Sequence, residues 1–201
     1  MEKIVIEDKE KENAYKKIEE FASLADLYYR ETIEEGKLFK SGKCKIEAIK
    51  KEDVKQYIKE FLSKIGELMQ IELHSEIRMD EDVINVSIIS DNSPILIGKE
   101  GKNLDALQTL LRQTIKNQTD MLIKINLDAS DYKLKKQKRL EREIKNIARE
   151  VLKTRIDAKL DPMNAFDRRI VHSVISTYDN LETESLGEAP NRYVTIKYKE
   201  N

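Results

Sequence analysis

The 201-residue sequence contains no tryptophan, few prolines and a single cysteine. Because Cys44 has no second cysteine to pair with, an intrachain disulfide is impossible, and a reducing cytoplasm is the expected compartment. The two histidines, His74 and His172, lie far apart in the sequence, so we expect neither a Cys/His metal site nor any cofactor. No apolar run approaches the ~20 residues of a membrane span, and the N-terminal residues do not resemble a signal peptide.

The formal net charge of −1 excludes a protein that is basic throughout. The simplest argument for nucleic-acid binding therefore fails, and the distribution of charge has to be examined locally. Hydrophobic residues make up 39 % of the chain. That proportion, with its clear periodicity, predicts one or two small domains with modest cores, with room for a third subdomain, rather than a disordered chain.

The first 50 residues predict a small β-α-β unit. Residues 3–6 and 45–49 are expected to be strands, with Gly36 and Gly42 marking turns before the second. Residues 9–29 are expected to form one helix, because apolar side chains recur there at spacings of three and four. These side chains are Tyr15, Ile18, Phe21, Ala22, Ala25 and Tyr29.

Residues 51–127 predict an α-β-β-α-α-β order. A strongly amphipathic helix over residues 50–70 is followed by an alternating strand over 71–79, a turn at 80–82 and a second strand over 83–89. Two helical segments then reach about Asn117, and residues 121–127 form a third strand. The apolar stripe of the first helix consists of Val54, Tyr57, Ile58, Phe61, Leu62, Ile65, Leu68 and Met69.

The segment "PILIGKEGKNLDALQTLLRQ", residues 94–113, places Gly98 and Gly101 between two helix-like segments. Since glycine has no Cβ, a sugar-phosphate chain can lie directly on such a turn. The helix that follows points its free N–H groups and positive dipole end toward it. Lys99 and Lys102 add positive charge. The apolar side chains expected to wall a narrow groove for bases are Ile95, Ile97, Leu104 and Leu107.

A plain helix–turn–helix corner, with glycine for steric reasons, explains the same turn. A P-loop is excluded because Leu96 stands where the first glycine of G-x-x-x-x-G-K belongs, and a dinucleotide fingerprint is absent. Within its α-β-β-α-α-β order, however, the segment resembles a type II KH domain over about residues 51–127. That resemblance implies a loop that clamps the backbone of about four single-stranded nucleotides. Glu100 departs from the family pattern and partly cancels the charge of Lys99.

A long helix to about Arg155, a break at Asp161-Pro162 and a second helix over 164–177 are expected after Asp131. Segments 180–185 and 192–198 predict two strands joined by a glycine/proline loop. Arg168 and His172 are four residues apart and share one helix face. We expect the second helix to be anchored to its core by Phe166, Ile170, Val171, Val174 and Ile175.

Two interpretations of Arg168 and His172 remain open. On an ordinary amphipathic helix they are an exposed arginine and a half-buried histidine. The longer string, with "ETESLGEAPNR" at residues 182–192, resembles the R-3-H (Arg-x-x-x-His) domain, which binds single-stranded nucleic acid. A hydrolase pair of His172 with Ser173 fails because adjacent helical side chains diverge by about 100°. No carboxylate cluster stands out, so we expect no enzyme.

The helix between the two motifs is locally basic. Residues 133–155 contain ten Lys or Arg and three Glu, a local charge of +7. A solvated charged face explains this pattern in isolation, but beside two nucleic-acid motifs it favours a phosphate track. One helical stripe carries Lys135, Arg139, Arg142, Arg149 and Lys153, and the opposite stripe carries Leu140, Ile144, Ile147 and Val151.

A KH domain followed by an Arg-His domain resembles the bacterial Jag family (SpoIIIJ-associated, KhpB or EloR). The resemblance is strong over about residues 51–201. It is weaker over residues 1–50, where the family's glycine-rich loop is reduced to Lys40-Ser41-Gly42-Lys43. We therefore predict an α+β protein with a Jag N-terminal-like unit (1–50), a type II KH domain (51–128) and an α/β Arg-His domain (129–201).

The resemblance implies a cytoplasmic RNA-binding regulator of cell elongation and division. It also implies a second small KH protein as partner and association with a membrane insertase. Separately, we consider a homo-oligomer of this chain. Two alternatives stay open: an interaction adaptor whose KH surface dimerises, and a single-stranded DNA binder. The residues expected to contact RNA are Gly98, Lys99, Gly101, Lys102, Lys135, Arg139, Arg142, Arg149, Arg168 and His172.

Overall fold

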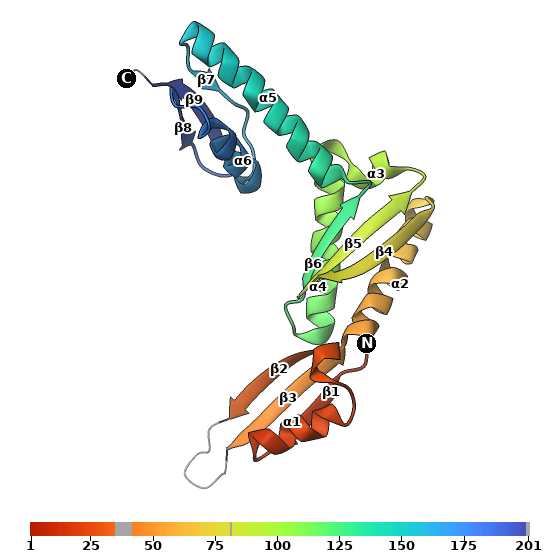
Figure 1. The fold of residues 1–201 in the computed structure, drawn as a ribbon. Helices are drawn as coiled ribbons and strands as arrows, with labels where there is room; N and C mark the ends of the chain where they lie inside the picture. The colour runs from red at the N-terminus through yellow and green to blue at the C-terminus, as the bar shows by residue number, and fades with distance from the viewer. Residues whose placement is uncertain (35–41, 81, 200–201) are drawn as a thin grey trace. The chain divides into compact units, whose positions relative to one another are not determined.

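The computed structural model describes residues 1–34, 42–80 and 82–199. The chain divides into two compact units, residues 1–130 and 131–201, which are described separately (Figure 1). Helices and three-stranded sheets occur in both, which confirms the predicted α+β class. Gly36, Lys40, Ser41 and Glu81, at which turns or loops are predicted, lie outside the described residues.

The first unit begins with a three-stranded antiparallel sheet of order β1-β3-β2. Its strands are β1 (Ile4–Asp8), β2 (Leu27–Glu34) and β3 (Lys43–Lys50), and helix α1 (Lys11–Glu19) packs on one face. Strands β1 and β3 confirm the two predicted strands. The buried core between helix and sheet consists of Ala14, Ile18, Leu27, Cys44, Ile46 and Ala48.

The single helix predicted over residues 9–29 is wrong. Helix α1 ends at Glu19, a short 3-10 turn η1 (Leu24–Asp26) follows, and the chain then enters strand β2. Ser23 starts the turn, since its hydroxyl accepts from the backbone N–H of Ala25 at 3.4 Å. The segment "LYYRETIE" is rich in aromatic and β-branched residues, which favour extended backbone, and Tyr29 pairs with Ala48 across the sheet.

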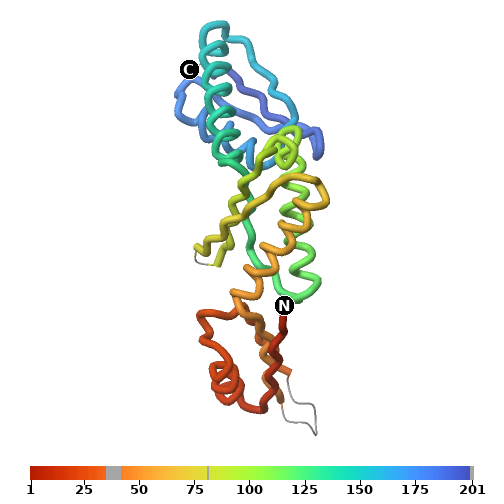
Figure 2. Tube along the Cα trace, turned by 90° about the vertical axis from the view of Figure 1, so that its right-hand side faces the viewer, coloured from red at the N-terminus to blue at the C-terminus, as the bar shows by residue number. Residues whose placement is uncertain are grey.

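The remainder of the first unit has the predicted α-β-β-α-α-β order. In its sheet, of order β4-β5-β6, the first pair of strands is antiparallel and the second parallel. Figure 2 shows α2 and α4 side by side along this sheet. The elements are α2 (Lys51–Met69), β4 (Leu73–Asp80), β5 (Val83–Ser90), α3 (Ser93–Ile97), η2 (Lys99–Gly101), α4 (Lys102–Thr119) and β6 (Lys124–Ala129).

The amphipathic pattern of α2 places its core correctly except at the C-terminal end. Val54, Ile58 and Leu62 are completely buried, whereas Leu68 is 71 % and Met69 is 39 % exposed. The last turn of the helix therefore presents apolar surface to solvent, contrary to the predicted continuous buried stripe. Strand β4 alternates between half-buried and exposed residues as its sequence predicts.

A charged cluster joins the first sheet to the end of α4. The buried carboxylate of Glu47 lies 3.1 Å from Lys3 and 3.1 Å from Lys45 and also pairs with Arg30. Lys3 reaches Asp120 at 3.4 Å, and Arg30 donates to the Asp120 carbonyl oxygen at 3.4 Å. Asp120 follows the last residue of α4. These cations stand where the negative end of the helix dipole is exposed.

We expect Glu47 to make this unit sensitive to acid. Hydrogen bonds from Arg30, Lys45 and Lys3 lower the pKa of Glu47 from 4.5 to about 2. The stabilisation is present above the unfolded pKa and is lost as the pH falls through the folded pKa. The free energy of unfolding of the wild type should therefore fall between about pH 5 and pH 2, and less so for Glu47→Gln. Urea denaturation at several pH values measures this, with Glu7→Gln as the exposed control; parallel curves for both variants would refute it.

The second unit packs two helices on one face of a sheet of order β7-β9-β8. Its elements are α5 (Tyr132–Thr154), β7 (Ala158–Lys159), α6 (Ala165–Ile175), β8 (Leu181–Leu186) and β9 (Tyr193–Tyr198). The core consists of Ile144, Ala148, Val151, Leu160, Val171, Ile175, Leu181, Val194 and Ile196.

Three details of the second unit differ from prediction. Helix α5 ends at Thr154, where Arg155 turns left-handed with φ +56°, so Pro162 is not what ends it. The two-residue strand β7 is too short to show a sequence pattern. Phe166 is 62 % exposed, so it does not anchor α6, whereas Ile170, Val171 and Ile175 are buried as expected. Within the described residues, no helix is both long and apolar enough to cross a membrane.

Candidate nucleic-acid interface

The glycine pair forms a tight turn directly before α4. Gly98 has φ +68° and Gly101 has φ +86°, and Glu100 between them is also left-handed at φ +57°. Gly101 occupies the position before the first residue of α4, where its lack of a side chain leaves the helix N-terminus without a side-chain cap. Lys99 and Lys102 are exposed on either side. The turn thus places two lysines beside the start of a helix that has no side-chain cap.

A steric requirement for glycine also holds at Gly98. A Cβ there would lie 2.5 Å from the side-chain Cγ of Asn103. The Asn103 amide is held in that place because it donates to the carbonyl oxygen of Ile95 at 2.9 Å. The corner explanation of this glycine is therefore supported by the structure, and it is compatible with a phosphate contact at the same turn.

The predicted apolar wall for bases is only partly present. Leu104 is 1 % exposed and belongs to the core, so it cannot contact a base. Ile95 is 45 % exposed, and Ile97 and Leu107 are half-buried. An apolar hollow of about 300 Å³ lies beside the turn, between α2, α3 and α4. It is lined by Ile65, Met69, Leu96, Asn103, Ala106, Leu107 and Leu110.

Helix α5 carries the predicted basic stripe on its exposed side. Ile144, Ala148 and Val151 face the core of the second unit, and the opposite stripe is exposed along the helix. Arg149 donates to Asn146, its neighbour on that stripe, at 3.3 Å. The five cations of the stripe, each exposed, are Lys135, Arg139, Arg142, Arg149 and Lys153.

Arg168 and His172 lie together on α6, as their spacing predicts. His172 is half-buried, and burial, followed by the charge of Arg168, lowers the pKa of His172 below its usual range. At neutral pH the imidazole is therefore neutral and acts through hydrogen bonds rather than charge. Arg168 is half-buried rather than exposed, and its Nε atom is buried without a hydrogen-bond partner among the described residues.

Two hydroxyl groups on β8 complete this site, and the sequence interpretation missed them. Nδ1 of His172 lies 2.6 Å from Thr183 Oγ1, and Nε2 lies 2.9 Å from Ser185 Oγ. Together they fix the ring on both sides beside Arg168. The signal that identifies them is the two-residue period of β8, which places both on the same face as the buried Leu181.

Arg168→Ala should weaken binding to single-stranded RNA about five-fold, or about 1 kcal/mol, because one hydrogen bond to a charged group contributes that much or somewhat more. The melting temperature should change little, because the buried Nε atom makes no hydrogen bond that the substitution would break. Arg169→Ala is the matched control, since Arg169 is an exposed arginine on the same helix. Affinity and melting temperature are measured on the same samples; equal affinities for the two variants would show that the motif is structural.

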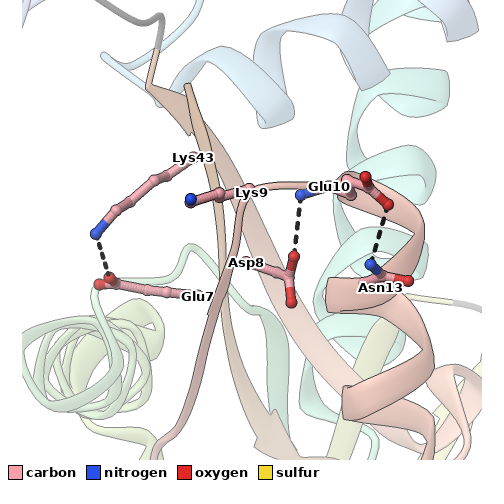
Figure 3. A pocket seen from close by; sticks show the side chains of 6 residues that line it. All are labelled: Glu7, Asp8, Lys9, Glu10, Asn13 and Lys43. Atoms are coloured by element: carbon pink, nitrogen blue, oxygen red, sulfur yellow. Dashed lines mark hydrogen bonds and ion pairs between the residues drawn. The ribbon is translucent and has the colours of Figure 1, made fainter. Parts of the chain in front are cut away.

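A second hollow, of about 420 Å³, lies at the start of α1 (Figure 3). Its charged and polar side chains contact one another: Lys43 lies 3.8 Å from Glu7, and Asn13 donates to Glu10 at 3.0 Å. Asp8 accepts the backbone N–H of Glu10 at 3.0 Å. We assign no ligand to this hollow.

Two family models match the chain. Residues 55–127 match the KH domain of KhpA/KhpB, and residues 138–198 match the R-3-H domain. The glycine turn lies within the first match, and the basic helix and the Arg168–His172 pair lie largely or wholly within the second. The fold and the matches thus define a protein that joins a KH domain to an R-3-H domain.

The chain is also similar to several named proteins. The chain is 34 % identical over 156 residues to "RNA-binding protein KhpB" of Clostridium symbiosum, covering 77 % of this chain and 70 % of the relative. It is 30 % identical over 156 residues to KhpB of Bacillus subtilis (strain 168), covering 77 % and 75 %. A KhpB of Streptococcus pneumoniae is 32 % identical over 113 residues, covering 56 % and 34 %. The chain belongs to the KhpB (Jag) family.

Proposed function

We propose that this protein is a non-enzymatic RNA-binding regulator that grips single-stranded RNA at two separate places. One is the Gly98–Gly101 turn with Lys99 and Lys102; the other is the basic stripe of α5 together with Arg168. The observation that carries the proposal is the glycine turn itself, where two positive-φ glycines and two exposed lysines lie at the start of a helix that has no side-chain cap. The relatives' name, RNA-binding protein, supports it.

Within the second unit we assign different roles to the two motif residues. Arg168 contacts a phosphate or stacks on a base, since its planar guanidinium suits either contact. His172 is a positioning residue, because both of its ring nitrogens are engaged by the hydroxyls of Thr183 and Ser185.

Membership of the KhpB (Jag) family supports a proposal for the role of this protein in the cell. We propose that the protein acts in the cytoplasm in bacterial cell elongation and division. We further propose a second small KH protein related to KhpA as its partner, and association with a membrane insertase or with a second copy of itself. Residues 1–50, 51–128 and 129–201 remain our proposed domains.

One observation favours an alternative, a protein-interaction adaptor. The hollow between α2, α3 and α4, whose lining includes Leu110, 51 % exposed, and Met69, 39 % exposed, is an apolar surface of the kind used for protein contacts. A single-stranded DNA binder is the other alternative, because the residues described do not distinguish a 2′-hydroxyl.

Titration of the full chain with labelled single-stranded RNA, the same sequence as DNA, and duplex RNA tests the proposal. We expect binding to the single strands and weaker binding to the duplex. Tighter binding to DNA than to RNA would favour the DNA alternative. If the protein binds none of the three, the protein-interaction adaptor is the remaining alternative.

Glu100→Lys should tighten RNA binding at the KH turn. The substitution replaces a negative charge with a positive one between Gly98 and Gly101, next to Lys99, so a phosphate on the turn gains attraction. Glu100→Gln is the intermediate control, which removes the charge without reversing it. Fluorescence anisotropy with a short single-stranded RNA measures the affinities. Identical affinities for all three proteins would show that phosphates do not contact this turn.

A further inference from the structure

A tyrosine on the outer face of the C-terminal sheet lies beneath a lysine. Val194 and Ile196 of β9 are completely buried against α5 and α6. Because side chains alternate along a strand, Tyr193 lies on the opposite face. The Nζ atom of Lys159, on the neighbouring strand β7, lies 4.4 Å from the centroid of the Tyr193 ring. This face is the reverse of the one on which His172 contacts Thr183 and Ser185 of β8.

The ring of Tyr193 lies beside the hairpin that precedes it. Leu186 pairs with Tyr193 across the sheet, so the two side chains share a face. Gly187, with φ +79°, lies close to the ring: an added Cβ there would lie 3.6 Å from Tyr193 Cε1 and 3.2 Å from the carbonyl oxygen of Asn191. The hairpin backbone at Gly187 therefore lies beside the edge of the ring, and its positive φ suits glycine.

Near Tyr193, positively charged side chains outnumber negatively charged ones. Glu184, further along β8, is neutralised by Lys197 at 2.6 Å. Lys159 of β7 lies over the ring, and Arg192, the residue before Tyr193, is exposed, whereas the hairpin carries one acidic residue, Glu188. Proteins that bind single-stranded nucleic acids combine aromatic rings, on which bases stack, with cations that contact the phosphate backbone.

We propose that Tyr193 is a stacking platform for one unpaired base of a single-stranded nucleic acid, and that Lys159 moves from the ring to the adjoining phosphate when the base arrives. The proposal rests on the proposed RNA-binding function and adds a contact to it. Stacking of a base on an aromatic ring is stronger than an exposed cation–π contact, so the base displaces the ammonium. The four-carbon stem of lysine lets the ammonium swing to a phosphate. Since every base has a π-face, this contact is not specific for one sequence.

The absence of tryptophan from the chain gives a direct test. Tyr193→Trp creates the sole tryptophan, whose fluorescence a stacked base should quench when single-stranded RNA is added to the full chain. Tyr198→Trp is the matched control, because Tyr198 also lies on β9 beneath a cation, Arg155 at 5.2 Å, but it packs against the core. We expect quenching in the first variant and little in the second.

Affinities complete the test. Tyr193→Leu should bind single-stranded RNA about ten-fold more weakly, whereas Tyr193→Phe should bind like the wild type. An abasic ribose-phosphate oligomer should bind the wild type and Tyr193→Leu equally. If anisotropy shows that RNA saturates Tyr193→Trp but the tryptophan fluorescence is not quenched, Tyr193 is not a stacking platform, whereas the proposed RNA-binding function still holds. RNA that fails to bind the wild type would overturn both.

Discussion

Gly98→Asp combined with Gly101→Asp should abolish RNA binding at the KH turn, with the far-ultraviolet circular dichroism close to that of the wild type. Both glycines have positive φ, which L side chains adopt only with strain. The aspartate side chain introduced at Gly98 would also displace Asn103, since a Cβ at Gly98 lies 2.5 Å from it. Two carboxylates at the start of α4 would repel a phosphate. The helix itself has no reason to unfold, because Leu104 and Leu111 keep it in the core.

The measurement uses residues 1–130, which form a compact unit, so that the second unit cannot mask the loss. Gln113→Asp combined with Asn117→Asp is the control, because it adds the same charge on the exposed face of α4, away from the turn. Lys99→Gln with Lys102→Gln should give a smaller loss without strain. If the glycine double variant binds RNA like the control, the turn is a structural corner. If it instead loses a protein partner and keeps RNA, the adaptor alternative is correct.

Raising the salt concentration from 50 to 200 mM should weaken binding of the full chain to single-stranded RNA about 100-fold. Contacts to four to six phosphates give a slope of about −3 to −4 in log affinity against log salt, at roughly −0.7 per phosphate. We expect the exposed stripe on α5 to supply a share of these contacts. Acidic residues elsewhere in the chain balance the charge of these cations, since the net charge is −1. The salt dependence therefore reflects local positive charge rather than the charge of the whole protein.

Removing two cations of the stripe tests how many of the phosphate contacts the stripe supplies. Arg142→Gln with Arg149→Gln should make the slope shallower by about 1.4, twice the contribution of one phosphate. Lys17→Gln with Lys64→Gln, on α1 and α2, is the control for a general loss of charge. A wild-type slope near zero would contradict the phosphate track. A slope unchanged by the α5 variant would place the phosphates elsewhere.

Regular periodicity explains what could be predicted from the sequence. The α-β-β-α-α-β order and helices α5 and α6 follow from long apolar patterns, which are strong signals because each residue on a buried face must be apolar. Strand β2 could not be predicted in this way because Ala25 and Tyr29 extend the helical spacing of α1 by coincidence. The pattern carries no information that Ser23 turns the chain.

Contacts between residues distant in the sequence could not be predicted. Lys3 and Asp120, 117 residues apart, meet only because the first sheet lies against the end of α4. The hydroxyls around His172 come from a different element, β8, and the burial of Leu104 depends on how α4 rotates onto its sheet. At the site, motif spacing identifies Gly98 and Arg168, whereas the orientation of their neighbours depends on packing.

The most direct test of the central claim, that this protein binds single-stranded RNA through its KH turn and its Arg-His domain, is ultraviolet crosslinking in cells followed by purification and sequencing of the attached nucleic acid. We predict that RNA is recovered with the wild type, and that Gly98→Asp, Gly101→Asp and Arg168→Ala together remove most of it. Recovery of DNA alone, or of no nucleic acid above an uncrosslinked sample, would contradict the account.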